Sequence, residues 1–314
     1  MRDRLILAGL IALAAAAILA FLTVNLRGHL AFALELRGVR LAALMTVALA
    51  IGLSTVVFQT ITGNRILTPS IMGLDALYQF GQTGLVFTLG GLGYVSLSPQ
   101  LKFTVGAAAL MLLAILILWP ALKRRMDLSL MLLAGIVIGG LFRSLTNLLA
   151  RLIDPQEFAV AQRAMVANFA APHTDLLLIA AAVTLVVGGF LFVRRHQLDV
   201  VALGQDSAIA LGIDWNRVVM IHLLCVSLLV AVSTALVGPV TFFGLLIAAL
   251  AERLTPSRRH ARIFLVAFLC GVIVLVGGQT LLQHGLGQAS TLSVVVDFIG
   301  GLVFILLLFG RHRR

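Results

Sequence analysis

The feature of this sequence that most constrains its fold is a succession of long apolar runs, separated by short polar or basic segments. An α-helix needs about 20 apolar residues to cross the hydrocarbon core of a bilayer, where every backbone polar group must be satisfied within the spanning segment. The sequence therefore predicts an all-α polytopic membrane protein with about ten transmembrane helices. We expect these helices at residues 5–25, 39–58, 70–97, 102–120, 129–150, 176–193, 217–237, 240–251, 262–282 and 290–309.

The composition agrees with this class of protein. Hydrophobic residues make up 61% of the 314 residues and charged residues 11%, whereas soluble domains carry about 25% charged residues. The formal net charge is +11, but the basic residues gather at the ends of the apolar runs, a pattern of membrane topology rather than nucleic-acid binding. No linker divides the chain. We predict one transmembrane domain over residues 1–314, in contact with membrane lipid and with no nucleic acid.

Three of the expected helices have unusual sequences. The run 70–97 contains five glycines in its middle, which predicts a broken or tilted span. The run 240–251 is too short to cross alone and follows Gly238-Pro239, which favours a half-helix joined to irregular backbone. The first run is longer than the apolar core of a signal peptide, so we expect it to be a retained span.

The distribution of Lys and Arg predicts the orientation. With the N-terminus inside, sixteen basic residues face the cytoplasm and six face outward, which the positive-inside rule favours. Both termini are then cytoplasmic. The inner set is Arg2, Arg4, Arg65, Lys123, Arg124, Arg125, Arg194, Arg195, Arg217, Arg253, Arg258, Arg259, Arg262, Arg311, Arg313 and Arg314, and the outer set is Arg27, Arg37, Arg40, Lys102, Arg151 and Arg163.

Two short polar segments between spans have the pattern of surface helices. Residues 203–214 lie on the predicted cytoplasmic side, where Gly204 and Asp206 can open a short helix and Gly212 can end it in the left-handed conformation. Asp214 is placed to cap the next helix. On the opposite side, an amphipathic helix is expected at about 155–170, either as a platform or gate beside a substrate path or as a simple connector.

Several segments together resemble one family in the same order. Residues 204–212, Gly-Gln-Asp-Ser-Ala-(x)2-Leu-Gly, resemble the cytoplasmic coupling segment of permease subunits of bacterial ABC importers for iron chelates and cobalamin. Residues 64–75, NRILTPSIMGLD, resemble the family's segment after the second span, most of all in the ferric-siderophore branch. Residues 238–245 and 293–301 resemble its half-helix and last span. Two departures are Ala248-Ala249, where the family continues with Pro-His, and Ile209, where relatives often carry a polar residue.

The resemblance implies an architecture and a set of functional residues. It implies the type II ABC importer permease fold, as a dimer around a central path, with cytoplasmic ABC ATPase subunits below and a periplasmic or lipid-anchored siderophore-binding protein above. Arg37 and Arg40 match an arginine pair that receives the binding protein, although both can instead anchor a helix end at the lipid headgroups. The implied ATPase-coupling residues are Gly204, Gln205, Asp206, Ala208, Leu211 and Gly212; the implied path and gate residues are Gln59, Asn64, Pro69, Gly73, Gly238, Pro239, Phe242 and Gly244.

The sequence offers no chemistry of its own. It contains no G-x-x-x-x-G-K-[ST] motif and no nucleophile with a base, so we expect no catalytic residue and no cofactor, with ATP bound by a partner subunit. Seven histidines without ligand spacing and two cysteines within apolar runs predict no metal site. Arg143, His222 and Asp297 are polar groups within spans; Arg143 and Asp297 either pair across the bundle or each reach an interface.

These patterns lead to one main hypothesis and several alternatives. The chain is predicted to be a multi-pass permease of the bacterial inner membrane that imports a ferric siderophore, in a heterodimer with a similar permease in preference to a homodimer. The same architecture could import cobalamin or haem. An ion-coupled secondary transporter, with Arg143 or Asp297 carrying the coupling, is a second class, and a structural membrane scaffold is a third.

Overall fold

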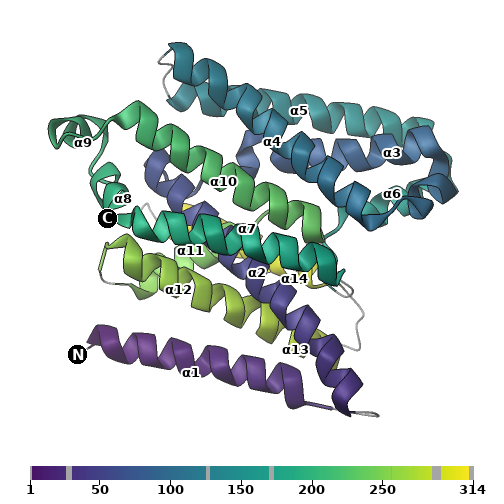
Figure 1. Cartoon of the computed structure of the whole chain (residues 1–314), viewed down its shortest axis with the longest axis horizontal. Coiled ribbons are helices and arrows are strands. Elements are labelled where there is room, and N and C mark those ends of the chain that lie inside the picture. The colour runs from purple at the N-terminus through teal and green to yellow at the C-terminus, as the bar shows by residue number, and fades with distance from the viewer. Residues whose placement is uncertain are drawn as a thin grey trace.

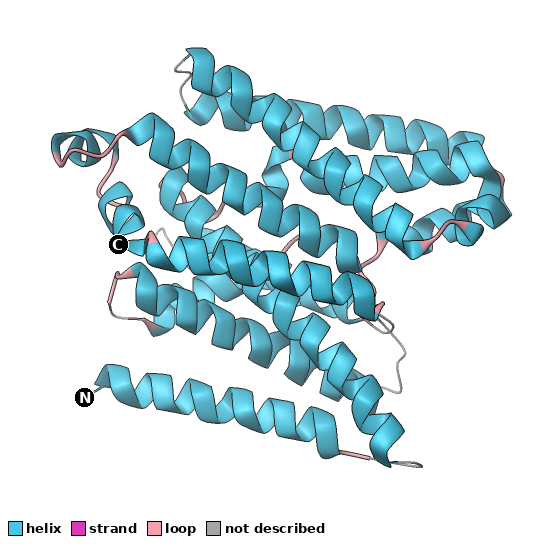
Figure 2. Ribbon diagram, in the orientation of Figure 1, coloured by secondary structure: helices cyan, strands magenta, loops and turns pink. Residues whose placement is uncertain are grey.

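The protein is described by a computed structural model over residues 2–25, 30–124, 128–169, 173–255, 257–284 and 291–310. Within these ranges every regular element is a helix, and the helices run roughly alongside one another in a single bundle (Figures 1 and 2). The predicted all-α membrane fold is therefore confirmed. The elements are α1 (Arg2–Thr23), α2 (Leu30–Thr62), η1 (Pro69–Met72), α3 (Leu74–Ser96), α4 (Pro99–Arg124), α5 (Leu128–Leu152), α6 (Pro155–Met165), α7 (Thr174–Val193), α8 (Arg195–Val201), α9 (Gln205–Ala210), α10 (Trp215–Val237), α11 (Phe243–Leu254), α12 (His260–Val272), η2 (Ile273–Gly277), α13 (Gly278–His284) and α14 (Leu292–Gly310).

The described helices occupy the positions of the ten predicted spans. Seven are long and apolar enough to cross a membrane: Arg4–Thr23, Leu30–Thr62, Pro99–Trp119, Ser129–Leu152, Thr174–Val193, Trp215–Val237 and His260–His284. The other three positions hold α3, α11 and α14. Helix α3 is kinked at Gly90, whose backbone has φ 70° and ψ 167°, and α11 has only 12 residues. The predicted broken span and half-helix are both present.

Helices α2 and α10 form the centre of the bundle. Buried residues make up 72% of the apolar window of α2 and 67% of that of α10, against 11% for α1. Helix α2 packs against α7, α10, α11 and α12, whereas α1 lies at the periphery (Figure 1). Because lipid is as apolar as the helices themselves, close packing rather than hydrophobic transfer holds such a bundle together.

Four local features differ from the sequence-based expectations. Helix α2 begins at Leu30 rather than near residue 39, because the apolar residues before Arg37 continue the helix beyond the expected boundary. The surface helix α6 ends at Met165, where the chain becomes extended so that the Asn168 N–H can donate to the Val237 carbonyl (2.6 Å). Helix α8 and the π-helical turn η2 were not predicted.

The two surface helices lie at opposite ends of the bundle. Helix α9 projects at one end, and α6 covers the far end of α3 (Figure 1). Asp154 occupies the N-cap of α6 and Pro155 its first turn, as predicted, although the Asp154 side chain makes no capping hydrogen bond. Glu157 instead accepts a hydrogen bond from the Gly91 N–H (3.1 Å), which ties α6 to the kink of α3.

Candidate coupling segment and inner gate

The candidate coupling segment is a short helix bounded by two glycines in left-handed or related conformations. Gly204 has φ +97° and Gly212 has φ +82°, both strained for residues with a Cβ. The Asp214 side chain accepts a hydrogen bond from the Arg217 N–H (3.2 Å) and caps α10. Gln205 and Asp206 form the first turn of α9, where a carboxylate suits the helix dipole.

Helix α9 presents an apolar surface away from the bundle. The Leu211 and Ile209 side chains are 62% and 52% exposed, whereas Ala208 is fully buried and faces the bundle. These two side chains give the projecting helix an apolar surface that a partner could cover. The predicted coupling residues thus form one unit, with Ala208 on its inner side and Leu211 on its outer side.

The predicted gate residues at the end of the second span and just after it fix the conformation of a loop. Gln59 donates from Nε2 to the Arg65 carbonyl (2.8 Å), and Asn64 Oδ1 accepts from the Ile66 N–H (3.0 Å). Pro69 then opens η1, and Gly73, at φ +82°, ends it and begins α3. We call residues 63–68 the gate loop. Its conformation is set by these side-chain contacts to its own backbone.

Gly73 also makes a contact that the sequence analysis missed. A Cβ built on Gly73 would lie 2.9 Å from the Cα of Gly139, and one on Gly135 would lie 2.9 Å from the Cα of Met72. Gly135 and Gly139 form a small-xxx-small pair on α5, which allows two backbones to approach closely. The spacing of Gly135 and Gly139 is the sequence pattern from which this close contact could have been predicted.

The half-helix α11 is fixed at its start by residues from distant parts of the chain. Gly238 (φ +98°) and the buried Pro239 lead into it, and a Cβ on Gly238 would lie 2.9 Å from the Cα of Ala167. The Phe242 N–H donates to Asp297 Oδ1 (2.9 Å), so a carboxylate of α14 caps α11. Among the described residues no ion pair joins Asp297 to Arg143, and the hydrogen bond from the Phe242 N–H ties α14 to the start of α11.

Small residues let α11 sit tightly among its neighbours. Gly244 packs directly on the Thr55 hydroxyl of α2, and a Cβ on Gly300 would lie 2.7 Å from the Cβ of Phe242. Thr241 donates to Asp75 Oδ2 (3.4 Å), linking α11 to α3. A small cavity between these elements brings together two predicted gate residues, Pro69 and Gly244, with hydroxyls around them.

Two other polar residues singled out in the sequence, Arg37 and His222, have internal partners. Arg37 donates from Nη1 to the carbonyls of Phe21 (2.8 Å), Leu22 (3.1 Å) and Val24 (2.8 Å), so it caps the end of α1. The Arg40 Nε is buried without a hydrogen bond. Their docking role stays a prediction. The buried His222 donates from Nδ1 to the Val218 carbonyl (2.7 Å) within its own helix.

Among the described residues, no group of three or more His, Cys, Asp or Glu side chains is placed to hold a metal ion. Cys270 is buried and Cys225 half-buried, each as a free thiol. Most of the polar contacts described above hold helix ends and the gate loop in place.

Comparison with known proteins identifies the family. Over 315 residues the chain is 39% identical to the petrobactin import system permease protein YclO of Bacillus subtilis (strain 168), covering 100% of this chain and 99% of that protein. It is 30% identical over 277 residues to the petrobactin import system permease protein FatC of Bacillus anthracis, covering 88% of this chain and 78% of that protein.

A solved structure shares the fold. An inward-facing metal-chelate type ABC transporter superposes with a TM-score of 0.84 at 22% identity, covering 98% of this chain and 99% of that chain. The family model described as the FecCD transport family matches residues 4–310. This chain therefore belongs to the FecCD transport family.

Proposed function

We propose that this chain is the transmembrane permease subunit of a bacterial ABC importer that carries a ferric siderophore into the cytoplasm. The observation that carries the proposal is the projecting, glycine-bounded helix α9 with Leu211 exposed at its tip. An importer that is driven by ATP but has no nucleotide-binding motif of its own needs a surface through which a separate ATPase can act on it. Helix α9 is a surface of this kind.

The proposed orientation places α9 in the cytoplasm. The same end of the bundle holds the start of α1 and the turn between α11 and α12, which carry many of the basic residues assigned to the inside (Figure 1). Both termini are then cytoplasmic, in the bacterial inner membrane. ATP binds to the partner ATPase subunits, and the permease carries no cofactor.

The proposed path lies where the gate loop, η1 and α11 meet. Closure of the ATPase would move α9 and tilt the helices that hold these elements, a rigid-body change around a central path. A second permease subunit completes the path, and we favour a different but similar chain as this partner. A binding protein delivers the chelate from outside, near Arg37 and Arg40.

Reconstituted uptake tests this function. The full importer, with both permeases, its ATPase and its binding protein, is placed in proteoliposomes and offered ferric petrobactin, because two relatives are petrobactin import permeases. We expect uptake of iron only when ATP is supplied on the side of the membrane that carries the ATPase subunits. A proton gradient alone should drive no uptake. Cobalamin and haem serve as competitor substrates. Uptake driven by the proton gradient without ATP would contradict the proposal.

A further inference from the structure

Helix α9 is joined to the bundle through helix α8. Helix α9 packs against α8 and α10, and α8 packs in turn against α2, α7 and α12. Although α8 has only seven residues, its Leu198 and Val201 side chains are buried in the main hydrophobic core. A force on α9 therefore reaches several spans through α8.

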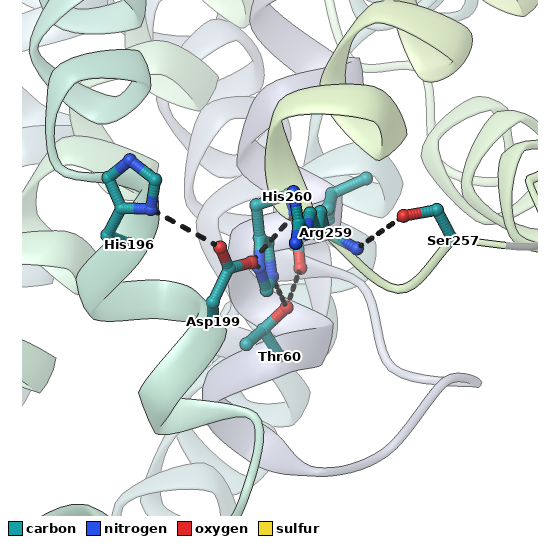
Figure 3. A network of polar contacts seen from close by, with 7 residues as sticks. Thr60, His196, Asp199, Ser257, Arg259 and His260 are labelled. Carbon is teal, nitrogen blue, oxygen red and sulfur yellow. Dashed lines mark hydrogen bonds and ion pairs between the residues drawn. The ribbon is translucent and has the colours of Figure 1, made fainter. Parts of the chain in front are cut away.

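A carboxylate on α8 binds the start of α12 twice. Asp199 Oδ1 accepts from the His260 backbone N–H (2.8 Å) and lies 2.7 Å from His260 Nδ1 (Figure 3). An ionised carboxylate can only accept, so Nδ1 is the donor. The His260 side chain is 3% exposed and the Asp199 side chain 28%, so the imidazole is shielded from water and the carboxylate is partly open to it.

The other side of the same imidazole contacts α2. His260 Nε2 lies 2.8 Å from Thr60 Oγ1, which is also 2.9 Å from the Val56 carbonyl (Figure 3). With neutral His260 the Thr60 hydroxyl donates to Nε2, and with charged His260 it accepts from Nε2 and donates to Val56. The connection between α12 and α2 is therefore retained in both protonation states.

Thr60 follows Gln59, the residue of α2 that forms a hydrogen bond with the gate loop. Gln59, its neighbour in α2, donates to the Arg65 carbonyl, and Arg65 pairs with Glu252 at the end of α11 (3.1 Å). A continuous series of contacts thus runs from α8, next to α9, through His260 to the end of α2 and the gate loop. Figure 3 shows the Asp199, His260 and Thr60 side chains turned toward one another from three different helices.

We propose that Asp199, His260 and Thr60 are positioning residues that make α9 and the gate loop move as one body when the ATPase closes. This inference rests on the proposed function, because it assumes that an ATPase acts on α9. Hydrogen bonds that share the buried His260 imidazole suit this role, because a change of geometry at one of them disturbs the others. We call the three residues the relay.

The test compares four variants in the reconstituted importer, three on helix α8 and Thr60→Val on helix α2. Asp199→Ala removes both bonds to His260, whereas Asp199→Asn keeps an oxygen in place to accept them. His196→Ala is the matched control on the same helix, because His196 is 77% exposed and lies 3.8 Å from the other carboxylate oxygen. ATPase association, ATP hydrolysis and iron uptake are measured on each preparation.

We expect Asp199→Ala to retain the ATPase subunits and to hydrolyse ATP, but to import roughly tenfold less iron per ATP. Asp199→Asn and His196→Ala should stay within about twofold of the parent. Thr60→Val, which removes one hydroxyl from the relay and little volume, should also lower iron per ATP. It provides a second variant if Asp199→Ala assembles poorly.

A distance measurement adds a readout that a loss of stability alone would not move. Spin labels at position 209 of α9 and at position 66 of the gate loop leave the Arg65–Glu252 ion pair in place. They should give one narrow distance distribution that ATP does not change in the parent, and a broadened, ATP-dependent one in Thr60→Val. Unchanged iron per ATP in both Asp199→Ala and Thr60→Val would overturn the relay. Absence of ATP-driven uptake by the parent importer would instead overturn the proposed function.

Discussion

A Gly73→Ala chain should be recovered from membranes at less than roughly a tenth of the parent's folded yield, with a lower thermal unfolding midpoint in detergent. Gly73 has φ +82°, a conformation that costs an L-residue roughly 1–2 kcal/mol. Its added methyl group would also lie 2.9 Å from the Cα of Gly139, where overpacking costs about 1–3 kcal/mol. A backbone atom cannot move aside as a flexible side chain can.

Gly81→Ala is the matched control for this prediction. Gly81 lies in the same helix, α3, and nothing stands within 4 Å of a Cβ built there. Its alanine should be neutral or slightly stabilising, because alanine favours a helix by about 1 kcal/mol over glycine. Equal folded yields for Gly73→Ala and Gly81→Ala would show that the junction of η1, α3 and α5 is not closely packed.

The second large effect is expected at the tip of the coupling segment. Leu211→Asp should leave the permease folded, since the Leu211 side chain is 62% exposed. It should weaken binding of the ATPase by roughly 30-fold or more, the factor for losing a hot-spot contact of about 2 kcal/mol, with an added cost for placing a charge in an apolar pocket. Uptake of iron should then fall to background.

Leu211→Met keeps the apolar bulk and should preserve both ATPase binding and uptake. The affinity of each purified permease for the ATPase is measured by titration, with size-exclusion chromatography as the check of folding. Undiminished ATPase binding by Leu211→Asp would remove α9 from the coupling interface, even if uptake were lost for another reason.

Much of this architecture follows from local sequence patterns. The apolar runs predict the spans because lipid admits few alternatives to a helix of about 20 residues. The short helix α9 was predictable because Gly204 and Gly212 bound it, and both adopt positive φ in the structure. The half-helix α11 followed from Gly238-Pro239 and from its short apolar run.

The partners of the polar residues could not be predicted in the same way. Asp297 caps α11 from 55 residues away, and Asp199 reaches His260 across 61 residues. Such contacts depend on how the helices pack, which hydropathy does not encode. Arg37 illustrates the same limit, since its bonds to carbonyls at the end of α1 depend on how α1 and α2 pack together.

The close approaches of helices at the glycines likewise depend on how distant parts of the chain pack together. The sequence indicates that residues 73 and 244 resemble family positions, but not that one meets α5 and the other meets Thr55. These close approaches explain why a small residue is needed at each position. They also place the junction of η1 and α3, and the half-helix α11, against closely packed neighbours.

The central claim, that α9 faces the cytoplasm where an ATPase can bind it, is tested most directly by labelling a single cysteine at position 209, whose side chain is 52% exposed. The two native cysteines, Cys225 and Cys270, are first replaced by alanine. A membrane-impermeant maleimide should leave this cysteine unmodified in intact cells and modify it in inside-out vesicles. Modification in intact cells would place α9 outside and contradict the account.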